Sequence, residues 1–272
     1  MVVMVVTGDE TRVALITGAS SGIGAALARE YARRGFVVAL LARRSDRLDE
    51  LAVEVEGVGA EALPIACDVT RDGDLERAVD AVLERFGRLD HVHANAGFGV
   101  AGWFHKLDVE DYRRQFETNV FGVLRTVFAT RESLEASGGC LAIMGSVSGE
   151  VAFPKSSPYS MSKFAVRALA DSLWSEFAST GVAVTLIEPG FIESEIRQVD
   201  NTGAYHADRK DAMPRWILMP ADRAARRMVT AIIRRRRKLV LTGHGKLAVA
   251  LSRFTPGVLA SLVRRFGHKR PR

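Results

Sequence analysis

The sequence predicts a doubly wound α/β fold, in which one parallel sheet of seven strands carries helices on both faces. Short apolar runs alternate along the chain with longer segments whose apolar residues recur every three or four positions. Strands that alternate with helices pair in parallel, because each helix returns the chain to the same end of the sheet. No repeat, low-complexity segment or linker rich in proline and glycine divides the chain, so we expect a single domain.

The first half of the chain supplies four of the expected strands and three helices. Its strands are apolar almost without interruption, as expected when helices cover both faces of a sheet. In the first helix, Ile23, Leu27 and Tyr31 recur every four residues and share one face. The expected strands are 13–17, 36–42, 62–67 and 89–94, and the expected helices are 22–34, 47–56 and 74–86.

The second half continues this alternation and then departs from it. A long helical pattern covers about 108–135. Between 191 and 219 the regular pattern breaks, and the stretch combines Tyr205, Met213 and Trp216 with many charged residues. We expect the sheet domain to cover 11–243. Its remaining strands are 139–145, 182–188 and 238–242, and its remaining helices are 157–180 and 221–233.

The bulk composition is that of an ordinary globular protein, with 47% hydrophobic and 26% charged residues in 272. No apolar run reaches the roughly 18 residues of a membrane-spanning helix, so none is expected. Residues 1–10 are expected to be a short extension without the features of a signal peptide, and either Met1 or Met4 could be the start. Cys67 and Cys140 have no spacing that suggests a metal site or a disulfide, so we expect buried reduced thiols and a cytoplasmic location.

The net charge of +6 is concentrated at the end of the chain. From Arg234 to Arg272 there are twelve lysines and arginines and no acidic residue. The tail over 244–272 contains two segments that combine apolar and basic residues, 246–254 and 258–266. These segments could lie on an anionic membrane surface, dock on the body of the protein and shape a pocket, or form a solvated basic face. Nucleic acid is not an expected partner, because no recognition motif accompanies the charge.

A glycine-rich stretch joins the first strand to the first helix: Thr17-Gly18-Ala19-Ser20-Ser21-Gly22-Ile23-Gly24. Glycine lacks a Cβ, so it permits a tight turn and the close approach of a pyrophosphate. The first N–H groups of the following helix are unpaired and lie at the positive end of its dipole, which favours an anion. This position indicates a dinucleotide-binding turn, although a plain turn between strand and helix could carry the same residues.

The end of the second strand indicates which dinucleotide binds. A site for NAD usually has an Asp or Glu here, which bonds the ribose hydroxyls. This chain has Ala42 followed by Arg43 and Arg44. A guanidinium can pair with a 2′-phosphate, which an acid would repel. We therefore expect NADP (NADPH), with Arg43 favoured as the phosphate contact, although either arginine could instead only solvate a loop.

Three side chains in the middle of the chain have the chemistry of proton transfer. Tyr159 and Lys163 are four residues apart on an expected helix, so both lie on one face. A hydride that reaches a carbonyl carbon leaves an alkoxide, and tyrosine can protonate it once a nearby cation lowers its pKa from about 10. Ser146 directly follows an apolar strand and could polarise the substrate oxygen. Ser148 is a rival by composition, and Tyr-x-x-x-Lys alone also occurs by chance.

Taken in this order, the turn and the set of Ser146, Tyr159 and Lys163 resemble the short-chain dehydrogenase/reductase family, whose members transfer hydride between a nicotinamide cofactor and a carbonyl or alcohol. The turn matches the family's T-G-x-x-x-G-I-G pattern at every fixed position, and Ser146 precedes Tyr159 by 13 residues, a usual family spacing. The resemblance implies a Rossmann-like fold and an NADP-dependent oxidoreductase. It also implies that Asn119 is a fourth catalytic residue, which anchors a water that links Lys163 to solvent.

Further segments extend the resemblance to the cofactor site. Asp68-Val69 corresponds to the segment that holds the adenine, and Asn95-Ala96-Gly97 matches the family's N-A-G signature, although Ala94 stands where a second Asn is usual. Pro189-Gly190 resembles the segment beside the nicotinamide, where the backbone of Ile192 would bond the carboxamide. The expected cofactor-binding residues are Gly18, Ser20, Ser21, Gly22, Ile23, Gly24, Arg43, Arg44, Asp68, Val69, Asn95, Ala96, Gly97, Tyr159, Lys163, Pro189, Gly190, Ile192 and Ser194.

The substrate is expected to be a small, lipophilic carbonyl compound or alcohol, such as a steroid, a retinoid or an acyl chain. In the family, the region that matches 191–219 is a lid over the substrate, and members form dimers or tetramers through the helices that here carry Asn119 and Tyr159. Aromatic residues near the strand ends would line an apolar pocket, although each could equally be ordinary core. They are Phe98, Trp103, Phe153 and Phe191.

Two other functions remain open. An epimerase or dehydratase could use the same fold and Tyr/Lys pair, but it usually needs a larger substrate-binding portion. A regulatory module that binds a nicotinamide dinucleotide without turnover would have lost catalytic side chains, and all four are present here. His91 and His93 alternate on one face of a strand without an evident third ligand, so we expect core histidines and no metal.

Overall fold

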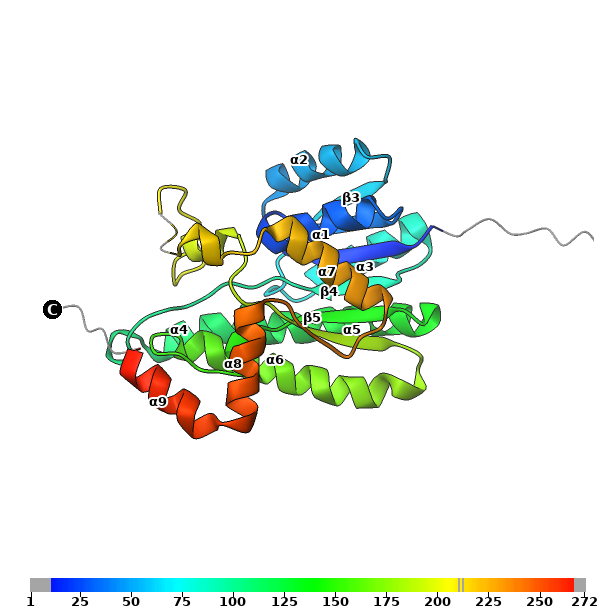
Figure 1. Cartoon of the computed structure of the whole chain (residues 1–272). Coiled ribbons are helices and arrows are strands. Elements are labelled where there is room, and N and C mark those ends of the chain that lie inside the picture. Colours follow the sequence, from blue (N-terminus) through cyan, green and yellow to red (C-terminus); the bar gives the residue numbers. More distant parts are fainter. Residues whose placement is uncertain (1–10, 210, 212, 267–272) are drawn as a thin grey trace, which may run out of the picture.

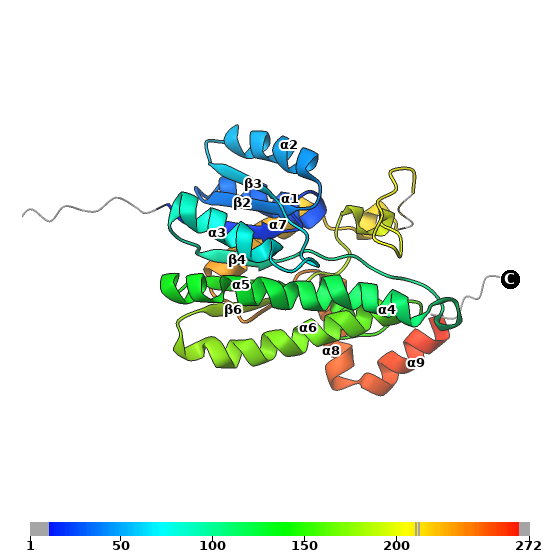
Figure 2. The same ribbon diagram turned by 180° about the vertical axis from the view of Figure 1, so that it is seen from behind.

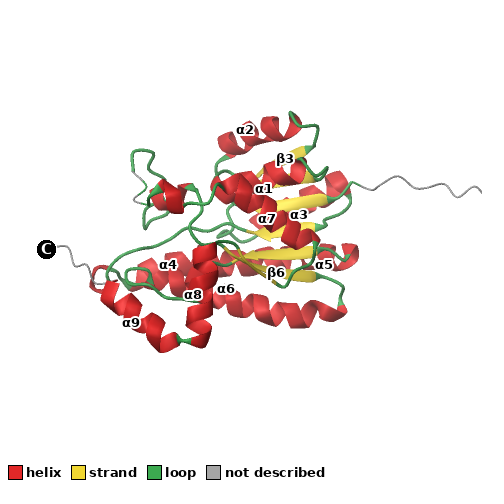
Figure 3. Ribbon diagram, in the orientation of Figure 1, coloured by secondary structure: helices red, strands yellow, loops and turns green. Residues whose placement is uncertain are grey.

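One parallel sheet of seven strands forms the centre of the molecule, which confirms the predicted fold class (Figures 1 and 3). This computed structural model describes residues 11–209, 211 and 213–266; the expected extension over 1–10 and the last residues of the tail lie outside the described residues. The strand order is β3-β2-β1-β4-β5-β6-β7, and all neighbours run in parallel. The strands are β1 (Val13–Thr17), β2 (Val37–Ala42), β3 (Ala62–Ala66), β4 (His91–Ala94), β5 (Cys140–Met144), β6 (Ala183–Glu188) and β7 (Lys238–Val240).

Helices cover both faces of this sheet (Figure 2). On each face, a separate apolar cluster lies between the helices and the sheet. The chain builds the sheet outward from β1 to β3 and then crosses back to place β4 on the other side of β1, and this reversal puts helices on both faces of the sheet. One face carries α1 (Gly22–Ala32), α2 (Ser45–Glu56) and α7 (Ala221–Ile233), and the other carries α3 (Asp74–Phe86), α5 (Gly122–Ser137) and α6 (Ser157–Glu176).

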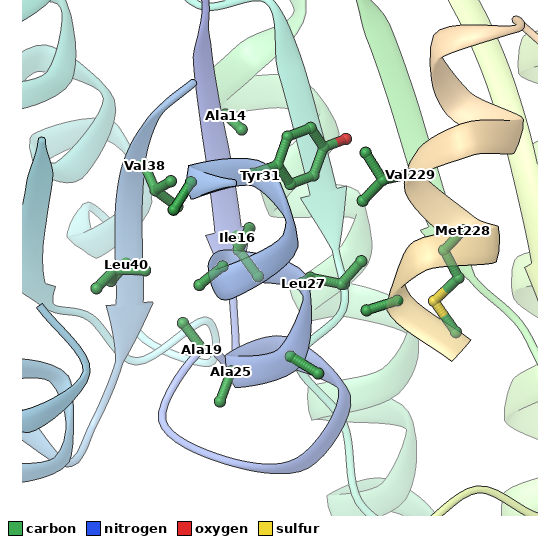
Figure 4. Packing of buried hydrophobic residues seen from close by; sticks show 14 of the residues in the cluster. Ala14, Ile16, Ala19, Ala25, Leu27, Tyr31, Val38, Leu40, Met228 and Val229 are labelled. Atoms are coloured by element: carbon green, nitrogen blue, oxygen red, sulfur yellow. The ribbon is translucent and has the colours of Figure 1, made fainter. Parts of the chain in front are cut away.

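The helix that follows the glycine-rich turn is held firmly in the core. Leu27 and Tyr31 are fully buried, as their spacing predicts, while Ile23 is partly buried at the edge of the same cluster. The Leu27 and Tyr31 side chains lie against the sheet beside Val229 of α7 (Figure 4). Each such buried side chain stabilises the fold by roughly 1.5–3 kcal/mol. The start of α1 therefore has a fixed position relative to the end of β1.

The two histidines of β4 are core residues, as predicted. The Tyr31 hydroxyl lies 3.0 Å from His91 Nδ1 and 2.8 Å from His93 Nε2, and Phe36 packs edge-on against the Tyr31 ring. Burial lowers the pKa of His91 to about 4 and the pKa of His93 to about 3, so both rings are neutral near pH 7. Within the described residues, no group of three or more potential ligand side chains could hold a metal ion.

The helical pattern expected over about 108–135 is interrupted by a wider turn. It consists of α4 (Val109–Phe116), a π-helical turn (Glu117–Phe121) and α5. Asp108 starts α4 with a capping box, in which its side chain accepts from Asp111 N at 2.9 Å. A π turn adds one residue to the helix locally, and such turns often lie at functional sites. Asn119 lies in this turn.

The basic tail folds into two further helices, α8 (Gly243–Phe254) and α9 (Pro256–Phe266). The Thr242 side chain caps α8 by accepting from Gly245 N at 3.2 Å, and the Ser252 hydroxyl ties α8 to the Glu150 carbonyl at 2.9 Å. Most of the described side chains of α9 are exposed. No helix of the described chain is both long enough and apolar enough to cross a membrane.

Candidate active site

The glycine-rich turn at the end of β1 has no room for a side chain at Gly18 or Gly24. Gly18 has a φ of +67°, and a Cβ there would lie 2.9 Å from the Cα of Ala96. A Cβ at Gly24 would lie 2.2 Å from the Gly18 carbonyl oxygen. The first turn of α1 is therefore pressed against the loop, and its free N–H groups form a cradle that fits a pyrophosphate.

The end of β4 is fastened to this turn by one threonine. Thr17 Oγ1 donates to the His93 carbonyl at 3.1 Å and accepts from the backbone N–H groups of Asn95 and Ala96, each at 3.0 Å. Asn95 Nδ2 returns a hydrogen bond to the Thr17 carbonyl at 2.8 Å. Thr17 is thus a positioning residue that the sequence motif contains but that the expected site residues omit.

The two arginines after β2 have different surroundings. Arg43 is exposed, whereas Arg44 Nε and Nη2 donate to Ser20 Oγ at 3.2 and 3.1 Å. Arg44 therefore lies directly over the glycine-rich turn. This placement favours Arg44 as the cation of the cofactor site, in contrast to the expectation from sequence, which favoured Arg43. Which arginine contacts a phosphate stays a prediction.

The segment expected at the adenine is shaped by local hydrogen bonds. Asp68 Oδ1 accepts from Thr70 N and Oγ1 at 3.0 and 2.7 Å, and the Asp68 N–H donates to Asp74 Oδ2 at 2.9 Å. Val69 is buried against α5, where a Cβ at Gly122 would lie 2.7 Å from its Cγ2. The carboxyl end of β3 thus presents Asp68 beside α3 in a fixed turn.

Asn119 is fully buried and holds the loop after β4. Its Oδ1 accepts from Phe98 N, and its Nδ2 donates to the Phe98 carbonyl, both at 3.1 Å. Nδ2 also lies 3.2 Å from Ser162 Oγ on α6. The loop approaches so closely that a Cβ at Gly97 would lie 2.9 Å from Asn119 Oδ1. The π turn therefore brings Asn119, the loop after β4 and the helix of Tyr159 together.

Ser146 and Lys163 each lie beside the end of β5. Ser146 is nearly buried, and its Oγ accepts from Ser148 N at 3.1 Å, so the rival serine supports the loop with its backbone. Lys163 Nζ donates to the carbonyl of Met144, the last residue of β5, at 2.7 Å. Burial lowers the pKa of Lys163 to about 8, which makes it a better proton donor than an exposed lysine.

Tyr159 is one helical turn before Lys163, but its acidity is governed by burial. Desolvation raises the pKa of Tyr159 above the usual value, while the Ser146 hydroxyl and the charge of Arg197 lower it. Lys163 Nζ lies 5.7 Å from the centre of the Tyr159 ring and donates to Met144 instead. In this arrangement Ser146 and Arg197 are the groups that lower the pKa of Tyr159, and the expected influence of Lys163 on this pKa stays a prediction.

Arg197 is a site residue that sequence reasoning missed. It lies in the irregular stretch after β6, where its Nη2 donates to the Ile192 carbonyl at 3.1 Å and pairs with Asp211 Oδ2 at 2.7 Å. Its charge reaches the Tyr159 phenol. Only the folded chain shows this, because a lone arginine in a charged, irregular segment has no distinguishing spacing.

The segment after β6 runs over the glycine-rich turn. Val147 N donates to the Pro189 carbonyl at 3.0 Å, which places Pro189-Gly190 beside the loop of Ser146. Gly190 is enclosed by Thr242 and the start of α8, since a Cβ there would lie 2.2 Å from Thr242 Oγ1 and 2.6 Å from His244 Nε2. Ile192 is buried, and Ser194 faces Gly22 so closely that a Cβ on Gly22 would lie 3.0 Å from the Ser194 Cβ. The expected cofactor residues from both halves of the sheet thus adjoin one another.

A charge cluster around two buried carboxylates, also missed from sequence, lies near Ser146. Lys238 Nζ forms ion pairs with Glu150 and, at 3.1 Å, with the fully buried Glu188; Arg167 Nη1 pairs with Glu150 at 2.9 Å. Burial and the neighbouring Glu150 raise the pKa of Glu188 to about 7, although Lys238 opposes the shift. The cluster joins β6, β7, α6 and the loop of Ser146.

The aromatic residues expected in a substrate pocket are only partly enclosed. Phe153 and Phe191 are exposed, and Trp103 is half-buried with Lys155 Nζ 4.9 Å from its ring centre. Phe191 stacks at a tilt on His244 of α8, with 5.4 Å between ring centres. The tail therefore contributes to the rim of the site. The membership of these residues in one pocket stays a prediction.

Comparisons with known proteins find relatives over most of the chain. The family described as short chain dehydrogenase matches residues 12–204. The chain is 40% identical over 188 residues to an A-factor type gamma-butyrolactone 1′-reductase of Streptomyces virginiae, covering 68% of this chain and 73% of the relative. It is 36% identical over 189 residues to 11-beta-hydroxysteroid dehydrogenase A of Sesamum indicum, but these cover 69% of this chain and only 54% of that relative. The chain therefore spans about half the length of some of the curated relatives that it matches.

Solved structures give the same result over most of the chain. An alcohol dehydrogenase of Thermococcus sibiricus, complexed with 5-hydroxy-NADP, superposes with a TM-score of 0.74 at 32% identity and covers 85% of this chain and 96% of its own. A short chain dehydrogenase/reductase of Burkholderia phymatum, in complex with NAD, has a TM-score of 0.77 at 25% identity and covers 94% and 92%. These complexes contain different dinucleotides, so the comparison supports a nicotinamide cofactor without choosing between them.

Proposed function

Because the chain belongs to the short-chain dehydrogenase family, we propose that it is an NADP(H)-dependent oxidoreductase that transfers a hydride between the nicotinamide and a carbonyl or secondary alcohol. The observation that supports the proposal is that Ser146 contacts Tyr159, Lys163 bonds the end of β5, and Asn119 joins the helix of Tyr159 to the loop after β4. In doubly wound sheets, ligands bind at this edge.

Each of the four residues has a distinct task in this proposal. The cofactor, when bound, supplies or accepts the hydride. In reduction, the Tyr159 hydroxyl donates its proton to the oxygen that becomes negative, and in oxidation its phenolate takes the proton back. The Ser146 hydroxyl donates a hydrogen bond to the same oxygen. Lys163, whose pKa is lowered to about 8, can return a proton to Tyr159, and Asn119 fixes the loop and helix between which that proton travels.

The preference for NADP rests on the cation beside the glycine-rich turn. Arg44 lies against Ser20, and no acidic residue stands at Ala42, the last residue of β2. A guanidinium at this place favours a 2′-phosphate. We expect NADPH to bind at least tenfold more tightly than NADH, a difference of about 1.4 kcal/mol. Equal dissociation constants in a fluorescence titration would contradict the preference.

Turnover is tested by NADPH oxidation against a broad panel of ketones and aldehydes. The names of two relatives, a hydroxysteroid dehydrogenase and a butyrolactone reductase, support a lipophilic substrate of the kind expected from the aromatic residues near the site. Reduction of at least one lipophilic carbonyl compound is expected. Binding of NADPH without turnover of any member would favour the regulatory module, and turnover without net change of cofactor would favour the epimerase.

A dimer or tetramer is proposed through α5 and α6. Their outer surface exposes Phe128, Met161 and Phe164. An open groove of about 590 Å³ is lined by α4, the π turn and Met161 of α6. Exposed apolar side chains gathered on neighbouring helices are typical of an interface. Light scattering during gel filtration should give twice or four times the mass of 29.7 kDa. A Phe128→Glu variant should shift the mass toward that of one chain.

Contact with an anionic membrane is proposed for α8 and α9. Leu247, Phe254, Val258 and Leu262 are exposed, and they alternate with lysines and arginines in a stretch that contains no carboxylate. In Figure 1 these helices lie at the same end of the molecule as the segment over 191–219. Co-sedimentation with phosphatidylserine vesicles at low salt is expected, and it should fall with Leu262→Asp. Free protein in the supernatant would exclude the contact.

A further inference from the structure

Arg44 connects the glycine-rich turn to the segment that crosses it. One side of its guanidinium donates to Ser20, while Nη1 and Nη2 reach a single carboxylate oxygen, Glu195 Oε2, at 3.1 and 3.2 Å. The guanidinium carbon also lies 5.5 Å from the ring centre of Tyr205. Glu195 and Tyr205 both belong to the irregular stretch after β6, so one cation fastens that stretch at two points.

The carboxylate of Glu195 already occupies a direction in which Arg44 could receive an anion. Glu195 follows Ser194, which packs against Gly22, and this contact brings its side chain to the turn. A guanidinium pairs in a plane with carboxylate or phosphate oxygens, and Glu195 uses two of its N–H groups. An incoming phosphate must therefore share those groups with Glu195 or replace it.

Replacement of Glu195 by a phosphate at Arg44 costs little free energy, because the ion pair between Arg44 and Glu195 is only partly shielded from water. The Arg44 and Glu195 side chains are 33% and 25% exposed. Ion pairs with this much exposure contribute little to stability, so a dianionic phosphate can compete for the arginine. A phosphate that comes close to Glu195 while the carboxylate stays in place meets like-charge repulsion.

We infer that Glu195 is an internal competitor for Arg44 and thereby sets how strongly the site discriminates between adenosine ribose with and without a 2′-phosphate. The inference rests on the proposed dinucleotide site, but it makes a separate claim. Removal of the Glu195 charge strengthens binding of the 2′-phosphate and leaves unphosphorylated ribose nearly unaffected. The same carboxylate also holds the stretch after β6 closed over the turn.

The test uses calorimetric titration of the full chain with two probes, 2′,5′-ADP and 5′-ADP. Glu195→Gln keeps the size of the side chain and removes its charge. This variant should lower the dissociation constant of 2′,5′-ADP at least about fivefold and change that of 5′-ADP less than about twofold. Glu193→Gln is the matched control, because Glu193 is exposed and two residues away in the same segment. It should change neither dissociation constant.

A double variant tests whether the effect of Glu195 on phosphate binding depends on Arg44. In Arg44→Gln protein, adding Glu195→Gln should no longer tighten 2′,5′-ADP, because the competed cation is gone. The stretch after β6 gives a readout independent of ligand. Amide hydrogen exchange over 194–199 should be faster in Glu195→Gln than in Glu193→Gln, since one of the two contacts to Arg44 is lost.

The outcomes separate this inference from the cofactor preference. If wild-type protein prefers 2′,5′-ADP and Glu195→Gln leaves that preference unchanged, the role of Glu195 is overturned while the NADP proposal stands. If wild-type protein does not discriminate but Glu195→Gln prefers 2′,5′-ADP, the role of Glu195 stands and the NADP preference fails. Binding of neither probe to any variant overturns both.

Discussion

Lys163 Nζ lies 2.7 Å from the carbonyl oxygen of Met144, so the ammonium group is held by the end of β5 and not by the phenol one turn before it. This hydrogen bond joins the centre of α6 to the central part of the sheet. It orients the lysine while its surroundings lower the pKa to about 8. Burial and a backbone contact therefore set the orientation and the pKa of Lys163, more than attraction to Tyr159 does.

Tyr159→Phe should abolish most of the activity and preserve cofactor binding. The variant loses only the hydroxyl that exchanges the proton, so turnover should fall at least ~10²-fold. The NADPH dissociation constant should stay within about twofold. Tyr112→Phe is a matched control, because it removes a hydroxyl that bonds Ser157 Oγ at 2.7 Å outside the proton-transfer set. Near-normal turnover of Tyr159→Phe would contradict the assigned role.

Arg44→Gln and Arg43→Gln should differ in their effect on cofactor preference. Arg44 contacts the glycine-rich turn through Ser20, whereas Arg43 is exposed. Loss of Arg44 should weaken the binding of NADPH at least about tenfold and the binding of NADH by less than about twofold. Loss of Arg43 should weaken NADPH binding by a smaller factor. Fluorescence titrations with both cofactors measure the change. The reverse order would restore Arg43 as the phosphate contact.

Glu188→Gln should change how stability depends on pH. Because the pKa of Glu188 is raised to about 7 from 4.5, its protonated form stabilises the native state most below pH 4.5, and the contribution is lost as pH rises to 7. The free energy of unfolding of wild type, relative to Glu188→Gln, should therefore fall across this window. Urea titrations at several pH values measure it, with exposed Glu84→Gln as control. A difference that does not change with pH would contradict the prediction.

Gly24→Ala should damage both the fold and the cofactor site. The new Cβ would lie 2.2 Å from the Gly18 carbonyl and 2.9 Å from Asn95 Nδ2, so the turn must move. We expect a loss of about 1–3 kcal/mol in unfolding free energy and weaker NADPH binding. Gly257→Ala in α9 meets nothing within 4 Å and should be neutral or stabilising by about 0.5–1 kcal/mol. Equal thermal unfolding of the two variants would refute the steric argument.

Much of the fold follows from local patterns. The apolar runs predict the seven strands to within a few residues. Periodic apolar spacing, such as that of Leu27 and Tyr31 in α1, predicts the main helices. The π turn does not follow from the same patterns. Its residues continue a helical periodicity, and the extra residue in the turn is stabilised by Asn119 bonds to Phe98 and Ser162, which the sequence does not place nearby. The sequence therefore predicts one continuous helix where the structure has a π turn between α4 and α5.

The sequence by itself determined the individual strands, the glycine-rich turn and the shared face of Tyr159 and Lys163, because each depends on residues only a few positions apart. The tertiary structure alone decided that Arg44 meets Glu195 and that Lys238 bridges Glu150 and Glu188. It also decided that burial raises the pKa of Tyr159. These features join segments far apart in the chain or depend on the exclusion of water, and local spacing contains neither kind of information.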